Sequence, residues 1–293
     1  MPGDWGFPNP ATPPGSSTYY SLRLAPISRR DGLAALYGWR YQLQSVLVQV
    51  TDAAVAAAKL RWWQDELART VAGTGSHPLT RQLGPVIDRL GLPAAPFLAM
   101  THGAAAIIER RRPRDPDALT AAAEQDLGAL FELLTRAAGD QDPAQIDRAR
   151  RLGAYTTLVY QIRDCGWLLR RERYEFVSTA QLTARGLQPA DLTRPTHRQH
   201  LPVILSELAA HARRLRGERR DPEGLPTPIR IRVRLADLLL DELAASAFDL
   251  ADQRIALTPL RKLWHAWRES RQPPPRSPNA IENPHPWNKN PHP

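Results

Sequence analysis

The sequence is poor in cysteine, in lysine and in long apolar runs, and each shortage excludes a class of protein. A single cysteine among 293 residues, Cys165, excludes an internal disulfide and a zinc site built from cysteines. No run of about 18 apolar residues is present, so we expect no membrane-spanning helix. Residues 1–15 lack the apolar stretch of a signal peptide, which predicts a cytoplasmic protein.

The positive charge of the chain is carried almost entirely by arginine. Lysine and arginine together number 39 against 30 acidic residues, giving a formal net charge of +9, and the only lysines are Lys59, Lys262 and Lys289. This balance suits an anionic partner, such as nucleic acid, a diphosphate or a membrane surface that the protein contacts peripherally. Nucleic acid is the weakest of these hypotheses, because no zinc-finger spacing or RNP-like aromatic string accompanies the arginines.

Apolar residues at helical spacing, interrupted by glycine and proline, run through residues 16–271. The pattern predicts one all-α domain with a single core. Asp52 follows a helix break, so we expect it to cap the next helix or to lie at the surface. Residues 1–15 are predicted to form a disordered leader, and residues 272–293 a disordered tail rich in proline, asparagine and histidine. The predicted helices are 28–50, 52–72, 77–90, 95–112, 116–138, 143–171, 202–219, 228–247 and 258–271.

Four segments with distinctive patterns follow one another along the chain. They are a serine- and tyrosine-rich stretch at 16–26 leading to Ala35-Leu36-Tyr37, a basic double-tryptophan stretch at 59–67 followed by His77-Pro78, an Arg163-Asp164 pair followed by the basic stretch 170–174, and the stretch from Arg254 to Trp267. In this order they resemble the squalene/phytoene synthase family, in the form of a divergent bacterial member. The resemblance implies an isoprenoid synthase-type helical bundle with a central cavity, and a reaction that joins two prenyl diphosphates head to head.

The resemblance also implies two aspartate-rich helices that face each other and hold Mg²⁺ with the diphosphate. Mg²⁺ prefers oxygen ligands in an octahedral array, and two Asp residues at i and i+4 lie on one face of a helix. At the matching positions this sequence has Gln44, Val48 and Leu168 in place of Asp, and it retains Asp164. A neutral amide and two aliphatic side chains cannot supply the missing charge, so we predict a degenerate metal site.

The same matches supply the candidate site residues. Asp164, Tyr37 and Tyr41 are the candidates for catalysis, with Tyr41 at the position of a family arginine and Asp164 as the candidate metal ligand. Structural interpretations stay open beside these: Asp164 as a member of a salt-bridge network, Tyr37 as core packing and Ser17 as a cap of a helix or turn. The candidates for binding the diphosphate are Ser17, Arg163, Arg170, Arg171 and Arg173.

Two functions of different class follow from this. We predict a catalytically impaired or non-catalytic relative that keeps a prenyl-lipid-type cavity as a binding or assembly module, because lost carboxylates remove most of the stabilisation of a departing diphosphate. The alternative is an active head-to-head prenyltransferase that uses farnesyl- or geranylgeranyl-type diphosphates, needs Mg²⁺ and, if it resembles squalene synthase in its second step, NADPH. The ligand in either case is a prenyl diphosphate or another isoprenoid lipid.

Overall fold

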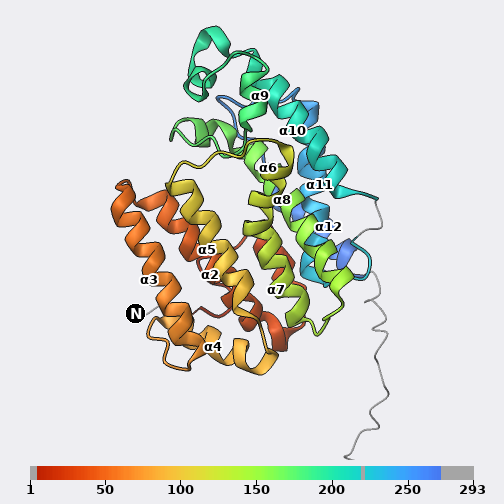
Figure 1. The fold of residues 1–293 in the computed structure, drawn as a ribbon. Coiled ribbons are helices and arrows are strands. Elements are labelled where there is room, and N and C mark those ends of the chain that lie inside the picture. Colours follow the sequence, from red (N-terminus) through yellow and green to blue (C-terminus); the bar gives the residue numbers. More distant parts are fainter. Residues whose placement is uncertain (1–4, 219–221, 272–293) are drawn as a thin grey trace, which may run out of the picture.

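The computed structural model describes residues 5–218 and 222–271. Within these ranges the chain is helical and contains no β-strand, which confirms the predicted all-α class. In Figure 1 the long helices α2, α3 and α5 lie alongside one another, and α8 separates them from α10, α11 and α12. No helix of these ranges has the length and apolarity needed to cross a membrane.

The observed elements agree with the predicted helices to within a few residues at most ends. Two short helices, α1 and α9, were not predicted, and the helix predicted over 116–138 is divided by a π-helical segment, η1. The elements are α1 (Ser17–Arg23), α2 (Ile27–Gln49), α3 (Ala53–Val71), α4 (Pro78–Leu90), α5 (Ala94–Ile108), α6 (Pro116–Ala123), η1 (Glu124–Gly128), α7 (Ala129–Ala137), α8 (Pro143–Leu169), α9 (Thr179–Thr183), η2 (Pro189–Thr193), η3 (Pro195–His197), α10 (His200–Arg216), α11 (Thr227–Ala245) and α12 (Pro259–Ser270).

Side-chain caps explain where several helices begin. The Asp52 carboxylate accepts a hydrogen bond from the Val55 N–H at 2.8 Å, so the predicted cap of α3 is present. Asp142 caps α8 in the same way, and Pro143 follows it at a position where a helix has no use for the missing N–H. These local signals are strong enough for the first residues of α3 and α8 to be predicted from sequence.

The expectation of a disordered leader is wrong for residues 5–15. Trp5 is only 7% exposed, and the Asn9 amide donates to the carbonyl oxygens of Trp5 at 2.8 Å and of Ala34, on α2, at 3.2 Å. A Cβ atom on Gly38 would come within 2.9 Å of the Trp5 ring, so α2 accepts this segment at a glycine. The proline-rich composition suggested disorder, but buried aromatic and amide contacts fix the segment. The predicted tail, 272–293, lies outside the described residues.

The core on the N-terminal side of the bundle is built around Trp39 of α2, which is fully buried. Its ring meets the edges of Trp63 and Phe97, with centroids 5.4 and 5.7 Å apart in T-shaped pairs. Such pairs add about 0.5–1.5 kcal/mol each beyond the area they bury. They hold α2, α3 and α5 together.

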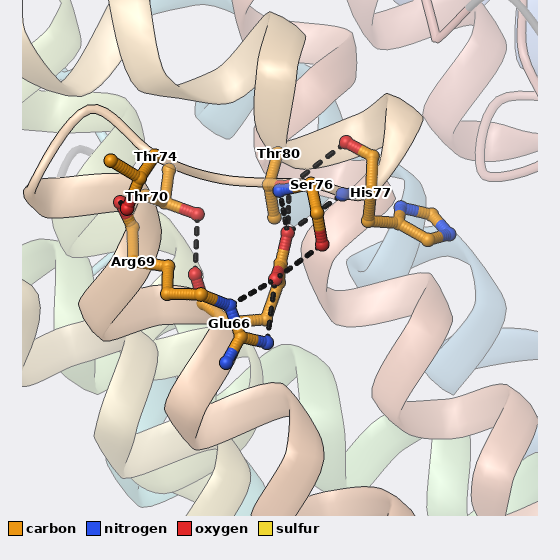
Figure 2. Close-up of polar contacts among 7 residues, drawn as sticks. All are labelled: Glu66, Arg69, Thr70, Thr74, Ser76, His77 and Thr80. Carbon is orange, nitrogen blue, oxygen red and sulfur yellow. Dashed lines mark hydrogen bonds and ion pairs between the residues drawn. The ribbon is translucent and has the colours of Figure 1, made fainter.

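A buried carboxylate joins α3 to the start of α4 (Figure 2). Glu66 is fully buried and accepts hydrogen bonds from the backbone N–H groups of Ser76 at 2.6 Å and His77 at 2.7 Å. The Thr80 hydroxyl and the Arg69 guanidinium donate to it as well. Burial alone would raise the pKa of Glu66, but these hydrogen bonds lower it from 4.5 to about 2. The loop before α4 is therefore organised by an ionised side chain.

We expect Glu66→Gln to lower the free energy of unfolding by about 2 kcal/mol at neutral pH, because charge-assisted hydrogen bonds to a buried group are lost. The folded pKa lies below the unfolded one, so the stabilisation by Glu66 is complete above pH 4.5 and disappears as the pH falls from 4.5 towards about 2. Urea unfolding across this range should give a flatter pH dependence for the variant than for the natural chain. Asp65→Asn, at an exposed neighbouring carboxylate, is the control, and equal slopes for Glu66→Gln and the natural chain would contradict the assignment.

Candidate functional site

A cavity of about 280 Å³ lies between α2, α5, η1 and α8. Gln44 and Val48 of α2 and Asp164 and Leu168 of α8 all line it, so the structure brings the two sets of matched positions to the same space. We call this space the inner cavity. It is the central cavity that the helical bundle was predicted to enclose.

A wider and more basic cavity, of about 870 Å³, adjoins the inner one. The two share Val48, Ile107 and Arg111 among their lining residues, and we call the second the outer cavity. The predicted diphosphate-binding residues Arg170 and Arg171 line it, and Arg173 lines both cavities. The arginines that line the outer cavity are Arg110, Arg111, Arg112, Arg170, Arg171 and Arg173.

The three predicted arginines around α8 and the segment after it already have partners. The Arg171 guanidinium carbon lies 4.1 Å from the Trp167 ring centroid, and Arg170 donates to the Ala251 carbonyl oxygen at 3.2 Å. Arg173 forms an ion pair with Glu175. Partners of this kind hold the guanidinium groups at the rim of the cavity.

A bidentate ion pair at the inner cavity involves a residue that the sequence analysis missed. Asp126 of η1 accepts from Arg40 Nε at 2.6 Å and from Arg40 Nη2 at 2.7 Å, and Gln44 Nε2 lies 3.4 Å from the same carboxylate. Burial alone would lower the pKa of Arg40, but the Asp126 carboxylate holds it above its usual value. Arg40 and Asp126 thus neutralise each other across the space between α2 and η1.

The π-helical segment explains why Asp126 reaches this place. A π-turn contains one more residue than an α-turn and leaves backbone groups without their usual partners. The Thr157 hydroxyl of α8 compensates, lying 3.3 Å from the Leu127 nitrogen and 3.4 Å from the Ala123 carbonyl oxygen. It also lies 3.5 Å from an Asp126 carboxylate oxygen. Nothing in the helical pattern of 116–138 signals this irregularity, so the sequence offered no way to find Asp126.

Asp164 lies in a salt-bridge network, as the structural interpretation predicted. Arg163 donates to both of its oxygens, at 2.9 and 2.5 Å, and Arg254 donates to one of them at 2.7 Å. Burial alone would raise the pKa of Asp164, but Arg163 and Arg254 lower it below its usual range. The carboxylate is therefore ionised and already neutralised by two guanidinium groups.

The remaining candidates lie at different depths. Tyr37 is buried, and burial raises its pKa, so its phenol stays protonated at neutral pH. Tyr41 is 36% exposed and lines neither cavity, because one residue along a helix is a rotation of about 100° and Arg40 takes the inward position. Tyr41 therefore lies outside the walls of both cavities, and its role in catalysis stays a prediction. Ser17 begins α1, which is capped by the hydroxyl of the adjacent Ser16.

The described residues do not fit a resident Mg²⁺. Three carboxylates line the inner cavity, Asp126, Asp164 and Glu175, and each is paired with an arginine. Within 5–218 and 222–271 no three His, Cys, Asp or Glu side chains come close enough to hold a metal ion. Magnesium needs free carboxylate oxygens, and the side chains of Gln44, Val48 and Leu168 supply none.

The Arg40–Asp126 pair can be tested by a double-mutant cycle. We expect Arg40→Met and Asp126→Leu each to lower the free energy of unfolding by about 1–3 kcal/mol, because each leaves a partly buried charge alone. The double variant should lose clearly less than the sum, with a coupling above about 1 kcal/mol. The exposed pair Arg111–Glu109 is the matched control and should couple by less than about 1 kcal/mol. Additive losses at Arg40 and Asp126 would contradict the pairing.

Comparison with known proteins agrees with this geometry. A family model, squalene/phytoene synthase, matches residues 11–261. A dehydrosqualene synthase crystallised with ligand superimposes with a TM-score of 0.71 at 20% identity, covering 86% of this chain and 90% of that one. The squalene synthase HpnC from Alicyclobacillus acidocaldarius gives 0.61 at 16% identity, covering 78% and 88%. YisP from Bacillus subtilis subsp. subtilis strain 168 gives 0.60 at 16%, covering 86% and 89%.

At these identities the solved structures establish the fold alone, and no curated protein matches the chain in sequence. The family model covers most of the chain, including α2, α5, η1 and α8, which border the inner cavity. The chain therefore belongs to the squalene/phytoene synthase family.

Proposed function

We propose that this chain binds an isoprenoid-type ligand in its cavity as a binding or assembly module, and that its catalysis is impaired or lost. One observation carries the proposal: every carboxylate that lines the inner cavity is paired with an arginine, and the matched positions Gln44, Val48 and Leu168 carry no charge. Ionising an allylic diphosphate requires strong stabilisation of the departing charge. The carboxylates that line the inner cavity are engaged by arginines, so they do not hold a metal ion that could stabilise this charge.

Freeing a carboxylate for a metal ion would be costly. Asp126 and Asp164 each have both oxygens engaged by a guanidinium group. Removing one partner of a partly buried ion pair costs about 1–3 kcal/mol, and the side chains of Asp126 and Asp164 are only 21% and 24% exposed. A metal ion would have to offset this loss before it contributed anything to catalysis.

The inner cavity keeps the apolar character that an isoprenoid chain needs. Met100, Ile107, Trp167 and Leu168 contribute apolar surface to its wall. Its volume of about 280 Å³ lies just below the range of ligand pockets, which is about 300 to 1,000 Å³.

The alternative is an active, Mg²⁺-dependent prenyltransferase, and Asp164 at the cavity wall is the observation that favours it. Under this alternative Asp164 would exchange its arginine partners for the metal when the diphosphate enters. NADPH would be needed only for a reductive second step. Nucleic-acid binding has less support, because Arg40, Arg163 and Arg173 direct their charge to carboxylates within the chain.

We expect no release of pyrophosphate above background when the protein is incubated with farnesyl diphosphate, Mg²⁺ and NADPH. Thermal melts should show no stabilisation by Mg²⁺ alone, because the free carboxylate oxygens that would bind it are missing. The matched variant Gln44→Asp/Val48→Asp restores two carboxylates at positions that are not buried, and we expect it to gain Mg²⁺-dependent stabilisation. Pyrophosphate release by the natural chain, with a C30 product and its loss in Asp164→Ala, would establish the active alternative instead.

The outward face of α12 supports a peripheral contact with a membrane surface. Leu260 is 79% exposed and Trp264 56%, and the Trp264 and Trp267 rings stack with centroids 5.4 Å apart. The Arg271 guanidinium lies over Trp267 at 4.0 Å, so cationic and aromatic groups alternate on this face. Tryptophan and leucine beside arginine suit the interface of an anionic bilayer. We propose this surface as the contact with anionic lipid from which an isoprenoid would be taken.

Sedimentation with vesicles tests the α12 surface. We expect the protein to bind phosphatidylglycerol vesicles more tightly than phosphatidylcholine vesicles, and salt to weaken the binding. Leu260→Ser/Trp264→Ser should weaken it more than about tenfold, because two large apolar side chains no longer enter the bilayer. Ile27→Ser/Val203→Ser, at two exposed apolar positions elsewhere, is the control and should change little. Equal binding of the two double variants to the vesicles would contradict the proposal that α12 contacts the membrane.

A further inference from the structure

The outer sides of α2 and α3 carry an apolar surface at the edge of the bundle, where α3 lies in Figure 1. Among the described residues, exposed large apolar side chains gather mainly in two places, on α12 and here. We propose that this second surface joins two copies of the chain in a two-fold symmetric dimer. The dimer goes beyond the proposed function and does not depend on whether catalysis is retained. The surface, which we call the α2–α3 face, consists of Tyr41, Val48, Val55 and Trp62, with Lys59 and Asp65 at its rim.

Trp62 of α3 is the central side chain of the α2–α3 face, and it is held in place although it is 41% exposed. Its ring forms a T-shaped pair with Trp63, with centroids 4.9 Å apart, and lies 6.1 Å from the ring of His77. The Arg69 guanidinium carbon lies 5.9 Å from the Trp62 ring centroid. Glu66 holds Arg69 in turn, accepting from its Nε at 2.9 Å (Figure 2). A tryptophan fixed in this way loses little conformational entropy on binding, which suits the centre of a protein interface.

Ring contacts connect Trp62 to the part of the face that lies on α2. The Trp5 ring lies 6.2 Å from Tyr41 and 6.3 Å from His77, which in turn contacts Trp62. Trp5 and Trp63 are buried, whereas Tyr41 and Trp62 are exposed. The exposed rings are therefore backed by the same buried rings and belong to one continuous surface. Continuous apolar surfaces of this kind mark interaction sites, whereas single exposed apolar residues do not.

Two charged residues flank Trp62 and have no ion-pair partner among the described residues. Lys59 lies three positions before Trp62 and Asp65 three positions after it, and both are exposed. Three residues turn an α-helix by about 300°, so the two side chains lie about 60° to either side of Trp62. The face thus carries one positive and one negative charge, placed symmetrically about an aromatic centre.

This arrangement is self-complementary. A two-fold axis through Trp62 makes α3 antiparallel to α3 of the second copy, and each position before Trp62 faces the position equally far after it. Lys59 of each copy then faces Asp65 of the other, which gives two ion pairs, and the two Trp62 rings meet at the axis. Val55 faces Arg69, whose charge a buried carboxylate already neutralises. No charged position of α3 faces a charge of the same sign.

A second copy suits the α2–α3 face better than a lipid surface does. Lys59 and Asp65 together carry no net charge, and Glu66 neutralises Arg69, so the face lacks the excess of cations that binds anionic lipid. An anionic bilayer would also repel Asp65 beside the central Trp62. Aromatic residues at the centre with opposite charges at the rim are the usual arrangement of a protein–protein interface.

Sedimentation equilibrium of the full chain tests the dimer. We expect a concentration-dependent equilibrium between the monomer and a species of twice its mass. Trp62→Ser should weaken this association at least about tenfold, because each copy loses the central tryptophan. Val203→Ser, at an exposed apolar position of α10, is the matched control and should change it by less than about twofold. A chain that stays monomeric, or a dimer that Trp62→Ser leaves unchanged, would overturn the proposal.

Charge exchange tests the two-fold geometry. Lys59→Asp leaves only acidic residues at the two rim positions and Asp65→Lys only basic ones, so each variant alone should associate at least about fivefold more weakly. Mixed in equal amounts, the two variants should form a mixed dimer, because opposite charges face each other again. Lys59→Asp/Asp65→Lys, which exchanges the charges within one chain, should associate within about twofold of the natural chain. Asp147→Lys, at an exposed position of α8, is the control for a change of net charge.

The other outcomes of these experiments are also decisive. Single charge variants that associate as tightly as the natural chain, or variants that form no mixed dimer, would overturn the two-fold arrangement. Vesicle binding that Trp62→Ser weakens, in a chain that stays monomeric, would assign the face to lipid and overturn the dimer. All substituted positions are exposed, so the variants should melt close to the natural chain when all are monomeric. Under the same monomeric conditions Asp65 is exposed, and Asp65→Asn remains a suitable control for the buried Glu66.

Discussion

The close crossing of α8 over η1 is the constraint on which the site depends. A Cβ atom on Gly153 would lie 2.4 Å from the Leu127 carbonyl oxygen, so the two segments meet backbone to backbone. The crossing places Thr157 against the π-helical turn and sets the height of Tyr160, Asp164 and Leu168 along α8. The residues of α8 that line the inner cavity are therefore positioned relative to η1 by this contact.

Ion pairs between side chains of the chain itself dominate the charges at the wall of the inner cavity. Arg40 with Asp126 and Arg163 with Asp164 are nearly neutral pairs that face the inner cavity. The carboxylates of Asp126 and Asp164 are therefore held by arginine side chains, and their charge is balanced within the chain.

Much of the fold could be predicted because it rests on local signals. Caps such as Asp52 and prolines such as Pro143 mark helix starts independently of the tertiary structure. The cavity positions Gln44, Val48, Asp164 and Leu168 were also found, because the family pattern keeps their spacing. The sequence could not reveal Asp126 or the inward direction of Arg40, since a π-turn and a rotation of one residue leave no trace in a helical pattern. Disorder was predicted for the N-terminal segment because it is rich in proline, and composition alone does not show that its tryptophan, Trp5, is buried against α2.

The extra residue in the turn of η1 has a consequence for how such a site could arise. A π-turn takes up one extra residue within the turn itself, so the residues of the turn are displaced while the helices on either side keep their relative phase. Removing one residue from Glu124–Gly128 would turn Asp126 away from Arg40 and leave Thr157 without the gap that it fills. The charge balance of the cavity is therefore encoded partly by the length of one helix, and a change of length could alter it without replacing any side chain in the wall.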